Sequence, residues 1–333
     1  MIWVSIAAGM GCNRLPNDVP PGALPDTFQK GMNLACWGES CYMGTGLGES
    51  LAMLQANGIR WVSVVLTAYQ DLPGDSELQV PAEAEIRASL EHAGRHAREM
   101  GFRMTVKPHV DVRDGTWRGE IDPADREAWF RSYEKYLLTV ARFSRELGVE
   151  QLVVGTELVR LSRHPDLWVK LIRNLRRHYH GRLLYAASWN EFESIAFWDE
   201  LDYAGINAFF PLTNRRNPAL IDLLAGWEYW IGRMEVWQAK IKKPVVFTEI
   251  GYTSRDGTNM HPYKFDTYDP IDLEEQALCY RAALMVFPKL PWLAGVYWWY
   301  WKVDARNGPM GGDYPPMGKP AEKILRQAWG AVH

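Results

Sequence analysis

The sequence has few cysteines, no excess of charge of one sign and no long hydrophobic run. Its 333 residues include four cysteines and no CxxC pair, too few for a disulfide framework. With 37 basic and 40 acidic side chains, the net charge of −3 gives no electrostatic footprint for nucleic acid or an anionic membrane surface. No apolar run reaches the roughly 18 residues of a membrane span. We therefore expect a globular protein with no nucleic-acid partner and no transmembrane segment.

Common motifs for nucleotides, serine nucleophiles and metals are also missing. No GxxxxGK[ST] run occurs, and Glu49 stands where a GxGxxG fingerprint after Gly44 needs its third glycine. The GxSxG elbow fails as well. His92 and His96 lie one helical turn apart, but no Glu of an HExxH motif and no third ligand accompanies them. The residues thus predict no metal site.

Tryptophan, by contrast, is abundant. There are 16 Trp among the 333 residues, and aromatic residues make up 13% of the chain. This is more tryptophan than a core needs, and it favours a cleft lined by flat apolar rings. Pyranose C–H faces stack on such rings.

The first residues resemble either an export segment or a truncated start. Residues 1–12 form a short apolar stretch ending at Cys12, similar to the end of a bacterial lipoprotein signal but without a positive region before it. Residues 13–26 contain four prolines and are typical of a tether. We expect a lead-in over residues 1–29 and an exported protein (secreted, periplasmic or lipid-anchored), while a cytoplasmic location stays open. Cys36 and Cys41 either form a disulfide within one loop or remain free thiols.

From residue 30 onward, apolar β-rich runs alternate with amphipathic helical patterns. Most runs are continuous rather than alternating, as in strands buried on both faces. Eight such β-then-α units follow one another without a break in composition, and eight is the number that closes a (β/α)8 barrel. We predict a single (β/α)8 TIM barrel of the α/β class over residues 30–333, with its chemistry at the C-terminal strand ends. The predicted strands are Gly31–Trp37, Trp61–Tyr69, Arg103–Val112, Gln151–Leu158, Arg182–Trp189, Tyr203–Pro211, Pro244–Tyr252 and Leu293–Trp301.

Two predicted strands carry a glutamate near their end, Glu157 and Glu249, each after an otherwise apolar run. An ionised side chain there is costly unless it faces a cavity or a partner. A strand-end glutamate of this kind either pairs with an arginine, caps the following helix or does chemistry. Two of them facing each other across a barrel mouth suit glycoside hydrolysis, which needs one protonated and one ionised carboxyl.

This pattern resembles the clan A (4/7 superfamily) glycoside hydrolases, which carry an acid/base Glu at the end of strand 4 and a nucleophile Glu at the end of strand 7. Within the clan the chain resembles glycoside hydrolase family 113, the β-1,4-mannanase family, over residues 30–330. The resemblance implies retaining endo-hydrolysis of mannan-type β-linked polysaccharide without a metal or organic cofactor, with Glu157 as acid/base and Glu249 as nucleophile. The segments that carry it are 30-KGMNLACWG-38, 155-GTEL-158, 203-YAGINAFFPL-212, 246-VFTEIGYTS-254 and 313-DYPPMGKPAEKIL-325.

Two positions depart from many clan members. Thr156 stands where many relatives have an Asn that contacts the sugar 2-hydroxyl, although a threonine hydroxyl still makes one such bond. Phe209 stands where many relatives have a Tyr that bonds the nucleophile. We expect Tyr252 or Tyr297 to supply that hydroxyl instead.

Four tryptophans are candidates for stacking on sugar. Trp298 and Trp299 are adjacent on a strand, so one faces the barrel mouth and the other packs away from it. The sequence does not decide which of the two is the sugar platform. Trp37 and Trp189, at other strand ends, are either platforms or core residues.

Polar residues at the strand ends are further candidates for sugar binding. Lys107 and His109 lie two apart on one strand and share a face. The lysine either donates to a sugar hydroxyl or keeps a nearby carboxylate ionised. Asn190 and Asn207 either bridge two hydroxyls or cap turns.

The sequence therefore predicts a monomeric, retaining, endo-β-1,4-mannanase-like glycoside hydrolase that acts on a β-linked polysaccharide or oligosaccharide. One alternative is a retaining hydrolase of another β-linked glycan, such as glucan, xylan or a surface polysaccharide. Another is a barrel that binds glycan without cutting it. The pair of Glu157 and Glu249 argues against this last alternative, because a binding module has no use for two facing carboxylates that repel each other.

Overall fold

The computed structural model of the protein describes residues 24–37, 41–304 and 311–330. Within them eight parallel strands form a closed barrel in sequence order, and β8 pairs with β1 to complete it. This confirms the predicted (β/α)8 barrel. Residues 1–23, which hold Cys12 and most of the predicted lead-in, lie outside the described residues. The strands are β1 (Gln29–Ala35), β2 (Trp61–Gln70), β3 (Arg103–Val112), β4 (Gln151–Thr156), β5 (Arg182–Ser188), β6 (Tyr203–Asn207), β7 (Val245–Ile250) and β8 (Leu293–Lys302).

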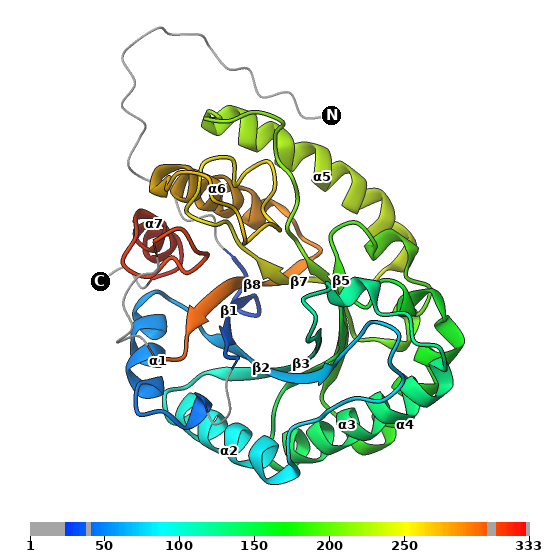
Figure 1. The fold of residues 1–333 in the computed structure, drawn as a ribbon. Coiled ribbons are helices and arrows are strands. Elements are labelled where there is room, and N and C mark those ends of the chain that lie inside the picture. Colours follow the sequence, from blue (N-terminus) through cyan, green and yellow to red (C-terminus); the bar gives the residue numbers. More distant parts are fainter. Residues whose placement is uncertain (1–23, 38–40, 305–310, 331–333) are drawn as a thin grey trace, which may run out of the picture.

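Helices surround the barrel (Figure 1). In the described part of the chain the α-helices are α1 (Leu47–Ala56), α2 (Glu83–Glu99), α3 (Arg126–Glu146), α4 (Pro165–His178), α5 (Leu220–Ile241), α6 (Leu273–Val286) and α7 (Pro320–Trp329). The link 189–202 between β5 and β6 instead contains two 3-10 helices, Phe192–Ser194 and Trp198–Glu200. The expectation of an α-helix after every strand is wrong here. An α-helix rises only about 1.5 Å per residue, so this short link cannot turn twice and also run a helix back along a strand.

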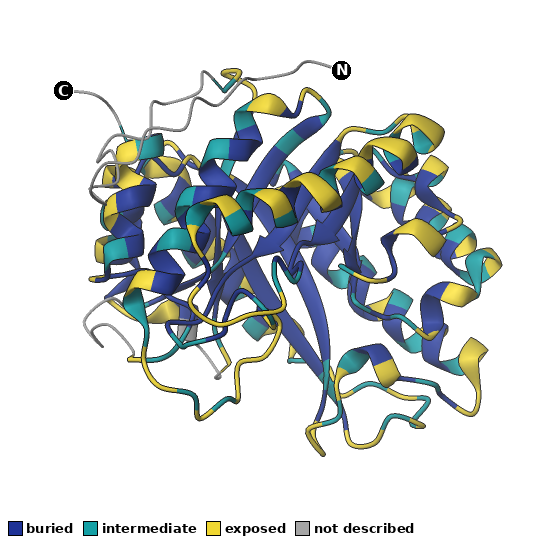
Figure 2. Ribbon diagram, turned by 90° about the horizontal axis from the view of Figure 1, so that it is seen from above, coloured by how far each residue is buried: buried dark blue, intermediate teal, exposed yellow. Residues whose placement is uncertain are grey.

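Burial follows the layers of the fold. The strands are buried on both faces, whereas the helices bury one side and expose the other (Figure 2). Asp125 caps α3 by accepting a hydrogen bond from the backbone N–H of Ala128 (2.9 Å). The residues that α3 buries recur at helical spacing and include Trp129, Tyr133, Tyr136, Leu137 and Val140.

Three hydrophobic clusters make up the core. The largest fills the space between the strands and the helices. A second lies inside the barrel and includes Trp61 and Tyr297, with Val153, Leu184, Ala186 and Val246. The third gathers residues near the C-terminal strand ends: Ala35, Val65, Phe209, Tyr300 and Tyr314. Because side chains fill the barrel interior, a substrate can only bind above them, at the mouth.

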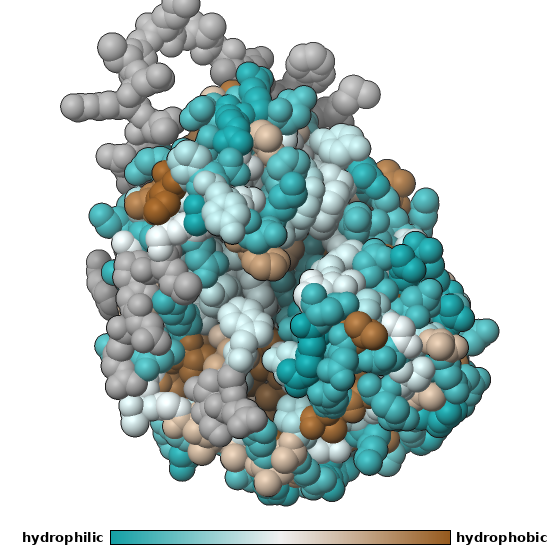
Figure 3. All heavy atoms as spheres, viewed as in Figure 1, coloured by the Kyte–Doolittle hydropathy of each residue, from teal (hydrophilic) through white to brown (hydrophobic). Residues whose placement is uncertain are grey.

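The surface and the cysteines add three observations. The face seen in Figure 3 is mostly hydrophilic and carries its hydrophobic residues in small separate groups. None of the helices in the described ranges combines the length and the apolar content that crossing a bilayer requires. Cys36 is disulfide-bonded, and Cys279 is a buried free thiol on α6.

Candidate active site

The two predicted glutamates stand at the C-terminal ends of β4 and β7. Glu249 lies within β7, and its backbone carbonyl accepts a hydrogen bond from the N–H of Ala208 (2.6 Å). Glu157 directly follows β4 and has a left-handed backbone, with a φ of 52°. That conformation is uncommon and costly for a residue with a Cβ, and such residues cluster at functional sites. The N–H of Glu157 still donates to the Ala186 carbonyl of β5 (2.8 Å), which ties the residue to the barrel.

Glu249 is buried and contacts Lys107 of β3. The Lys107 ammonium donates to the Glu249 carboxylate, and also to the side-chain oxygen of Asn207 (3.3 Å) and the carbonyl of Thr248 (3.3 Å). Burial raises the pKa of the Glu249 carboxyl, and the adjacent Lys107 charge acts against that rise. Burial likewise lowers the pKa of Lys107. The Lys107 contact therefore opposes the rise in the pKa of Glu249 that burial causes.

Glu157 has different surroundings, since it is only half-buried. The indole N–H of Trp117 donates to its Oε2 atom over 3.2 Å. Trp117 precedes the 3-10 helix Arg118–Glu120 in the loop after β3, and 43% of it is exposed. The partner of the Glu157 carboxyl is thus a neutral donor beside solvent, whereas that of Glu249 is a buried cation.

The two carboxyls interact electrostatically. The charge of Glu157 adds to the rise in the pKa of Glu249. The Arg118 guanidinium interacts with both carboxylates. The structure therefore brings together at one mouth the two glutamates that the sequence predicted. The positive charges of Lys107 and Arg118 lie close to them.

Trp299 is the β8 tryptophan at the mouth. Its ring lies parallel to that of His109, with 6.1 Å between the centroids and 16° between the planes, and it lies 5.8 Å from the Lys107 ammonium. Trp37, which is 52% exposed, meets the ring of Trp299 edge-on at 6.3 Å and that of Tyr300 at 5.3 Å. Trp299 and Trp37 thus form an aromatic wall beside the residues that hold Glu249.

Trp189, after β5, belongs to a second aromatic group. Its ring stacks on Tyr263 at 5.6 Å and 15°, and it meets Trp230 edge-on at 5.7 Å. It also packs, together with Trp299, against the cluster at the strand ends that contains Phe209. Trp189 and the exposed Tyr263 therefore line the mouth on the side of β5 to β7.

Three aromatic predictions need correction. Trp298 is fully buried and stacks on Tyr280 of α6 at 3.9 Å, so it packs between the barrel and the helices and cannot contact sugar. Tyr252 is buried near the same tyrosine, at 6.3 Å, and lies in the outer core. The Tyr297 hydroxyl bonds with Gln29, Thr105 and Gln151 inside the barrel. The hydrogen bond to Glu249 that was expected from a tyrosine is instead donated by Lys107.

Of the polar candidates, some lie beside Glu249 and others do not. Asn207 contacts Lys107 and accepts from the Thr248 hydroxyl (2.9 Å), so it lies beside Glu249. Thr156 is buried, and its hydroxyl donates to the Pro108 carbonyl (3.3 Å). The single O–H of Thr156 is therefore not available to donate to a sugar hydroxyl. Asn190 is exposed in the turn after β5.

Three residues near the site were missed by the sequence analysis: Trp117, Arg118 and Glu191. Trp117 and Arg118 lie in a loop, where no periodicity marks a functional residue. Glu191 comes two residues after the predicted strand Arg182–Trp189 and was not predicted as a site residue. It accepts a hydrogen bond from the Tyr185 hydroxyl (3.0 Å), which itself accepts from the N–H of Leu158 (3.0 Å), the residue after Glu157. Burial raises the pKa of Glu191 to about 8.

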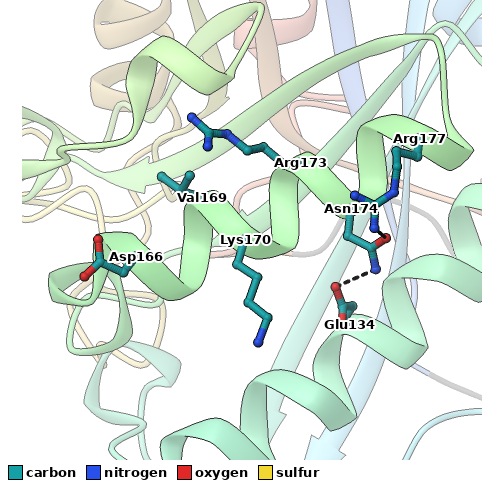
Figure 4. A pocket seen from close by; sticks show the side chains of 7 residues that line it. All are labelled: Glu134, Asp166, Val169, Lys170, Arg173, Asn174 and Arg177. Carbon is teal, nitrogen blue, oxygen red and sulfur yellow. Dashed lines mark hydrogen bonds between the residues drawn. The ribbon is translucent and has the colours of Figure 1, made fainter.

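A separate hollow lies on the outside of the barrel between α3 and α4 (Figure 4). In it the Asn174 amide donates to Glu134 (2.8 Å), and Arg177 donates to the Asn174 oxygen (2.5 Å). The lining side chains are Glu134, Asp166, Val169, Lys170, Arg173, Asn174 and Arg177. It sits on the helical layer, away from the strand ends, and is not the candidate site.

Comparisons with known proteins agree with this geometry. Among solved structures, a GH113 β-1,4-mannanase in a complex is 26% identical over 91% of this chain and 98% of its own, with a TM-score of 0.81. The GH113 β-mannanase from Alicyclobacillus acidocaldarius in complex with ManMIm is 26% identical over 93% and 99%, with a TM-score of 0.80. The β-glucuronidase from Ruminococcus gnavus, at 12% identity over 91% and 51% with a TM-score of 0.63, shares the fold alone. No curated protein matches the chain.

The family comparison covers most of the sequence. The model of Glycoside Hydrolase Family 113 matches residues 38–314, a range that contains both glutamates and the seven strands from β2 to β8. The protein is a glycoside hydrolase, and the chain belongs to glycoside hydrolase family 113.

Proposed function

We propose that the protein cleaves β-1,4-mannosidic linkages in mannan-type polysaccharides with retention of configuration at the anomeric carbon. The observation that carries the proposal is the unequal setting of two carboxyls, with Glu249 buried against Lys107 and Glu157 half-buried beneath the Trp117 indole. Retaining hydrolysis needs one carboxylate that attacks and one carboxyl that exchanges protons. The surroundings of Glu249 suit the attacking carboxylate, and those of Glu157 suit the carboxyl that exchanges protons.

In the first step the Glu249 carboxylate attacks the anomeric carbon as the glycosidic C–O bond breaks. Glu157 donates its proton to the departing oxygen, so the leaving sugar departs as an alcohol. The product is a glycosyl ester on Glu249 and an ionised Glu157. Lys107, Asn207 and the β7 backbone hold the attacking carboxylate in one orientation.

In the second step water replaces the leaving sugar. Glu157, now ionised, takes a proton from the water as its oxygen attacks the anomeric carbon, and the bond to Glu249 breaks. Two inversions at the same carbon give net retention. The Trp117 N–H, a neutral donor to Glu157, is compatible with both protonation states of that carboxyl.

Two observations support a mannan-type substrate. The two solved structures that share the fold at 26% identity are a β-1,4-mannanase and a β-mannanase. Aromatic rings flank the carboxylates on two sides, with Trp37 and Trp299 on one and Trp189 and Tyr263 on the other, which suits a chain of sugars better than a single one. Because a polymer is met outside the cell, we also propose that the enzyme is exported.

The test is hydrolysis of mannan, glucomannan, xylan and cellulose oligomers, with the anomer of the first products read by NMR before mutarotation. We expect cleavage of the mannan substrates, with the β-anomer formed first. An α-anomer formed first would overturn retention, and cleavage confined to xylan or cellulose would overturn the substrate. Glu249→Ala prepared in parallel controls for a contaminating hydrolase.

A further inference from the structure

The two ring nitrogens of His109 have different surroundings. His109 is buried on β3 under the ring of Trp299. Its Nδ1 atom lies 2.8 Å from the Arg118 guanidinium. Its Nε2 atom lies 3.8 Å from the Glu249 carboxylate and has no hydrogen-bond partner among the described residues. One nitrogen is therefore occupied, and the other is buried and free beside the proposed nucleophile.

The contact with Arg118 determines where the imidazole proton lies. A guanidinium has five N–H donors and no acceptor, so a nitrogen that contacts it must offer a lone pair. An imidazolium carries N–H at both nitrogens and would set one N–H against another. The His109 ring is accordingly neutral, with its proton on Nε2.

Arg118 is itself fixed in place. Its second nitrogen donates to the carboxylate of Asp111, which lies two residues after His109 on the same face of β3. The charged groups around the His109 ring are Arg118, Asp111, Lys107 and Glu249. Burial, followed by the positive charges of Arg118 and Lys107, lowers the pKa of His109 well below its ordinary value.

The 3.8 Å between Nε2 and the Glu249 oxygen is too long for a direct hydrogen bond. An oxygen placed off the line that joins these two atoms can lie within hydrogen-bond distance of both. A sugar hydroxyl there would accept from the Nε2–H and donate to the carboxylate, which satisfies a buried donor that is costly to leave unpaired. The other tautomer would point a lone pair at the same place and leave the hydroxyl without a donor.

We propose that Arg118 is a positioning residue that holds His109 as the neutral Nε2–H tautomer, so that this N–H donates to a hydroxyl of the sugar bound against Glu249. The proposal deepens the proposed function and rests on it, because that function places a sugar at Glu249. The role assigned to Arg118 runs through His109 and requires no contact between Arg118 and the substrate; the charge of Arg118 also acts on both carboxylates, so the tautomer and not the activity decides the proposal.

The first test reads the tautomer directly, without substrate. Histidine is labelled with ¹⁵N, and the two-bond ¹⁵N–¹H spectrum is recorded between pH 5 and 9, with the His109 signals assigned by their loss in His109→Gln. In the wild-type protein we expect a protonated Nε2 and a bare Nδ1 across the range. In Arg118→Met we expect His109 to populate the other tautomer as well, with proton signal appearing at Nδ1.

Two further variants separate positioning from a merely structural role. Arg118→Lys keeps an N–H donor for Nδ1 and should retain the wild-type tautomer. Arg113→Met removes an exposed arginine that contacts Gln79 and Asp71 near the end of β3, and should leave the His109 signals and the activity unchanged. With mannan oligomers, Arg118→Met should lower kcat/KM by about 10- to 100-fold, the range for one lost hydrogen bond of this kind, and Arg118→Lys should restore part of it.

The outcomes are distinguishable. A wild-type His109 protonated at Nδ1, or a spectrum of folded Arg118→Met identical to that of the wild type, overturns the proposal even if activity falls. Should Arg118→Met fail to fold, the wild-type and Arg118→Lys spectra still decide. If mannan is not cleaved by the wild-type protein while its spectrum shows the Nε2–H tautomer, the proposed function fails and the assignment of the tautomer to Arg118 stands.

Discussion

Glu157 and Glu249, the two carboxyls proposed to carry the chemistry, stand in contrasting regions of the same barrel mouth. Around Glu249 the backbone still belongs to strand β7, the side chain is buried and its partner is a cation. Around Glu157 the strand has ended, the backbone is left-handed, the side chain is half-buried and its partner is a neutral indole. The difference fits two separate chemical requirements. A nucleophile must keep its negative charge and its position, whereas an acid/base residue must donate a proton and then accept one.

The contrast extends to the residues behind each carboxyl. Lys107 is anchored by Asn207 and the Thr248 carbonyl, so the charge next to Glu249 is fixed by neighbouring strands. Behind Glu157, the Tyr185 hydroxyl accepts from the N–H of Leu158 and donates to Glu191. That link holds the backbone next to Glu157 and does not involve the Glu157 carboxyl. The predictions below test whether the two regions divide the chemistry in this way.

The largest effect is expected from Glu249→Ala. Without a nucleophile no glycosyl ester forms, so turnover should fall by about 10⁵-fold or more on every substrate, activated or not. Added azide should occupy the vacated face and give an α-glycosyl azide, identified by NMR. Glu235→Ala, an exposed change on α5, is the matched control and should keep full activity. Residual turnover equal to that of the control would remove Glu249 from the mechanism.

Glu157→Ala should cost less, about 10²- to 10⁴-fold on mannan, since only proton transfer is lost. An aryl mannoside with a good leaving group needs no proton in the first step, so its phenol should appear in a burst and then stall. Azide should restore turnover and give the β-glycosyl azide. If the azide products of Glu157→Ala and Glu249→Ala were exchanged, the two roles would have to be exchanged as well.

Lys107→Met should act through the pKa of Glu249. With the ammonium gone, only the smaller effect of the Arg118 charge opposes the rise in the pKa of Glu249 that burial imposes, so Glu249 stays protonated to a higher pH. The acid limb of kcat/KM should move upward in pH, and activity near neutrality should fall by about 10- to 100-fold. The measurement is the pH profile of kcat/KM beside that of Lys170→Met, an exposed change on α4. An unmoved acid limb would mean that Lys107 only packs against the site.

The strands could be predicted from the sequence because their signal is local. Parallel barrel strands are buried on both faces, and the resulting continuous apolar runs placed β3 at Arg103–Val112, as observed. Strand ends were less certain. β6 ends at Asn207 rather than at Pro211, since apolar residues continue past the strand into the cluster at the mouth. The absence of an α-helix between β5 and β6 could not be predicted from the sequence, because the pattern of apolar and polar residues continues through the link.

The site was partly predictable for the same reason. A glutamate after an apolar run is conspicuous, and this located Glu157 and Glu249. The alternation of a strand showed that Trp298 and Trp299 point apart, but the choice between them depends on the packing of Trp298 against α6, which a single strand does not encode. Arg118 reaches His109 from a loop, and loops carry no periodicity from which such a contact follows.

The smallest effect on activity, and the sharpest on stability, is expected from Glu191→Gln. The amide oxygen still accepts from the Tyr185 hydroxyl, so the backbone after Glu157 keeps its support and kcat should change little. Stability should depend on pH differently in the two proteins. Burial raises the pKa of Glu191 from 4.5 to about 8, so between these values the folded protein holds a proton that the unfolded chain has released.

The sign follows from that proton. Where the folded state binds more protons than the unfolded state, the free energy of unfolding falls as pH rises, by up to about 1.4 kcal/mol per pH unit for one group. The wild type should therefore lose stability from about pH 4.5 to about pH 8, whereas Glu191→Gln, which cannot ionise there, should lose less. Urea unfolding of both proteins across this range measures the difference, with Glu193→Gln, an exposed neighbour paired with Arg233, as control. A difference that stays constant with pH would show that Glu191 is ionised in the folded protein, and that the β4 region holds a second negative charge beside Glu157 instead of a neutral support.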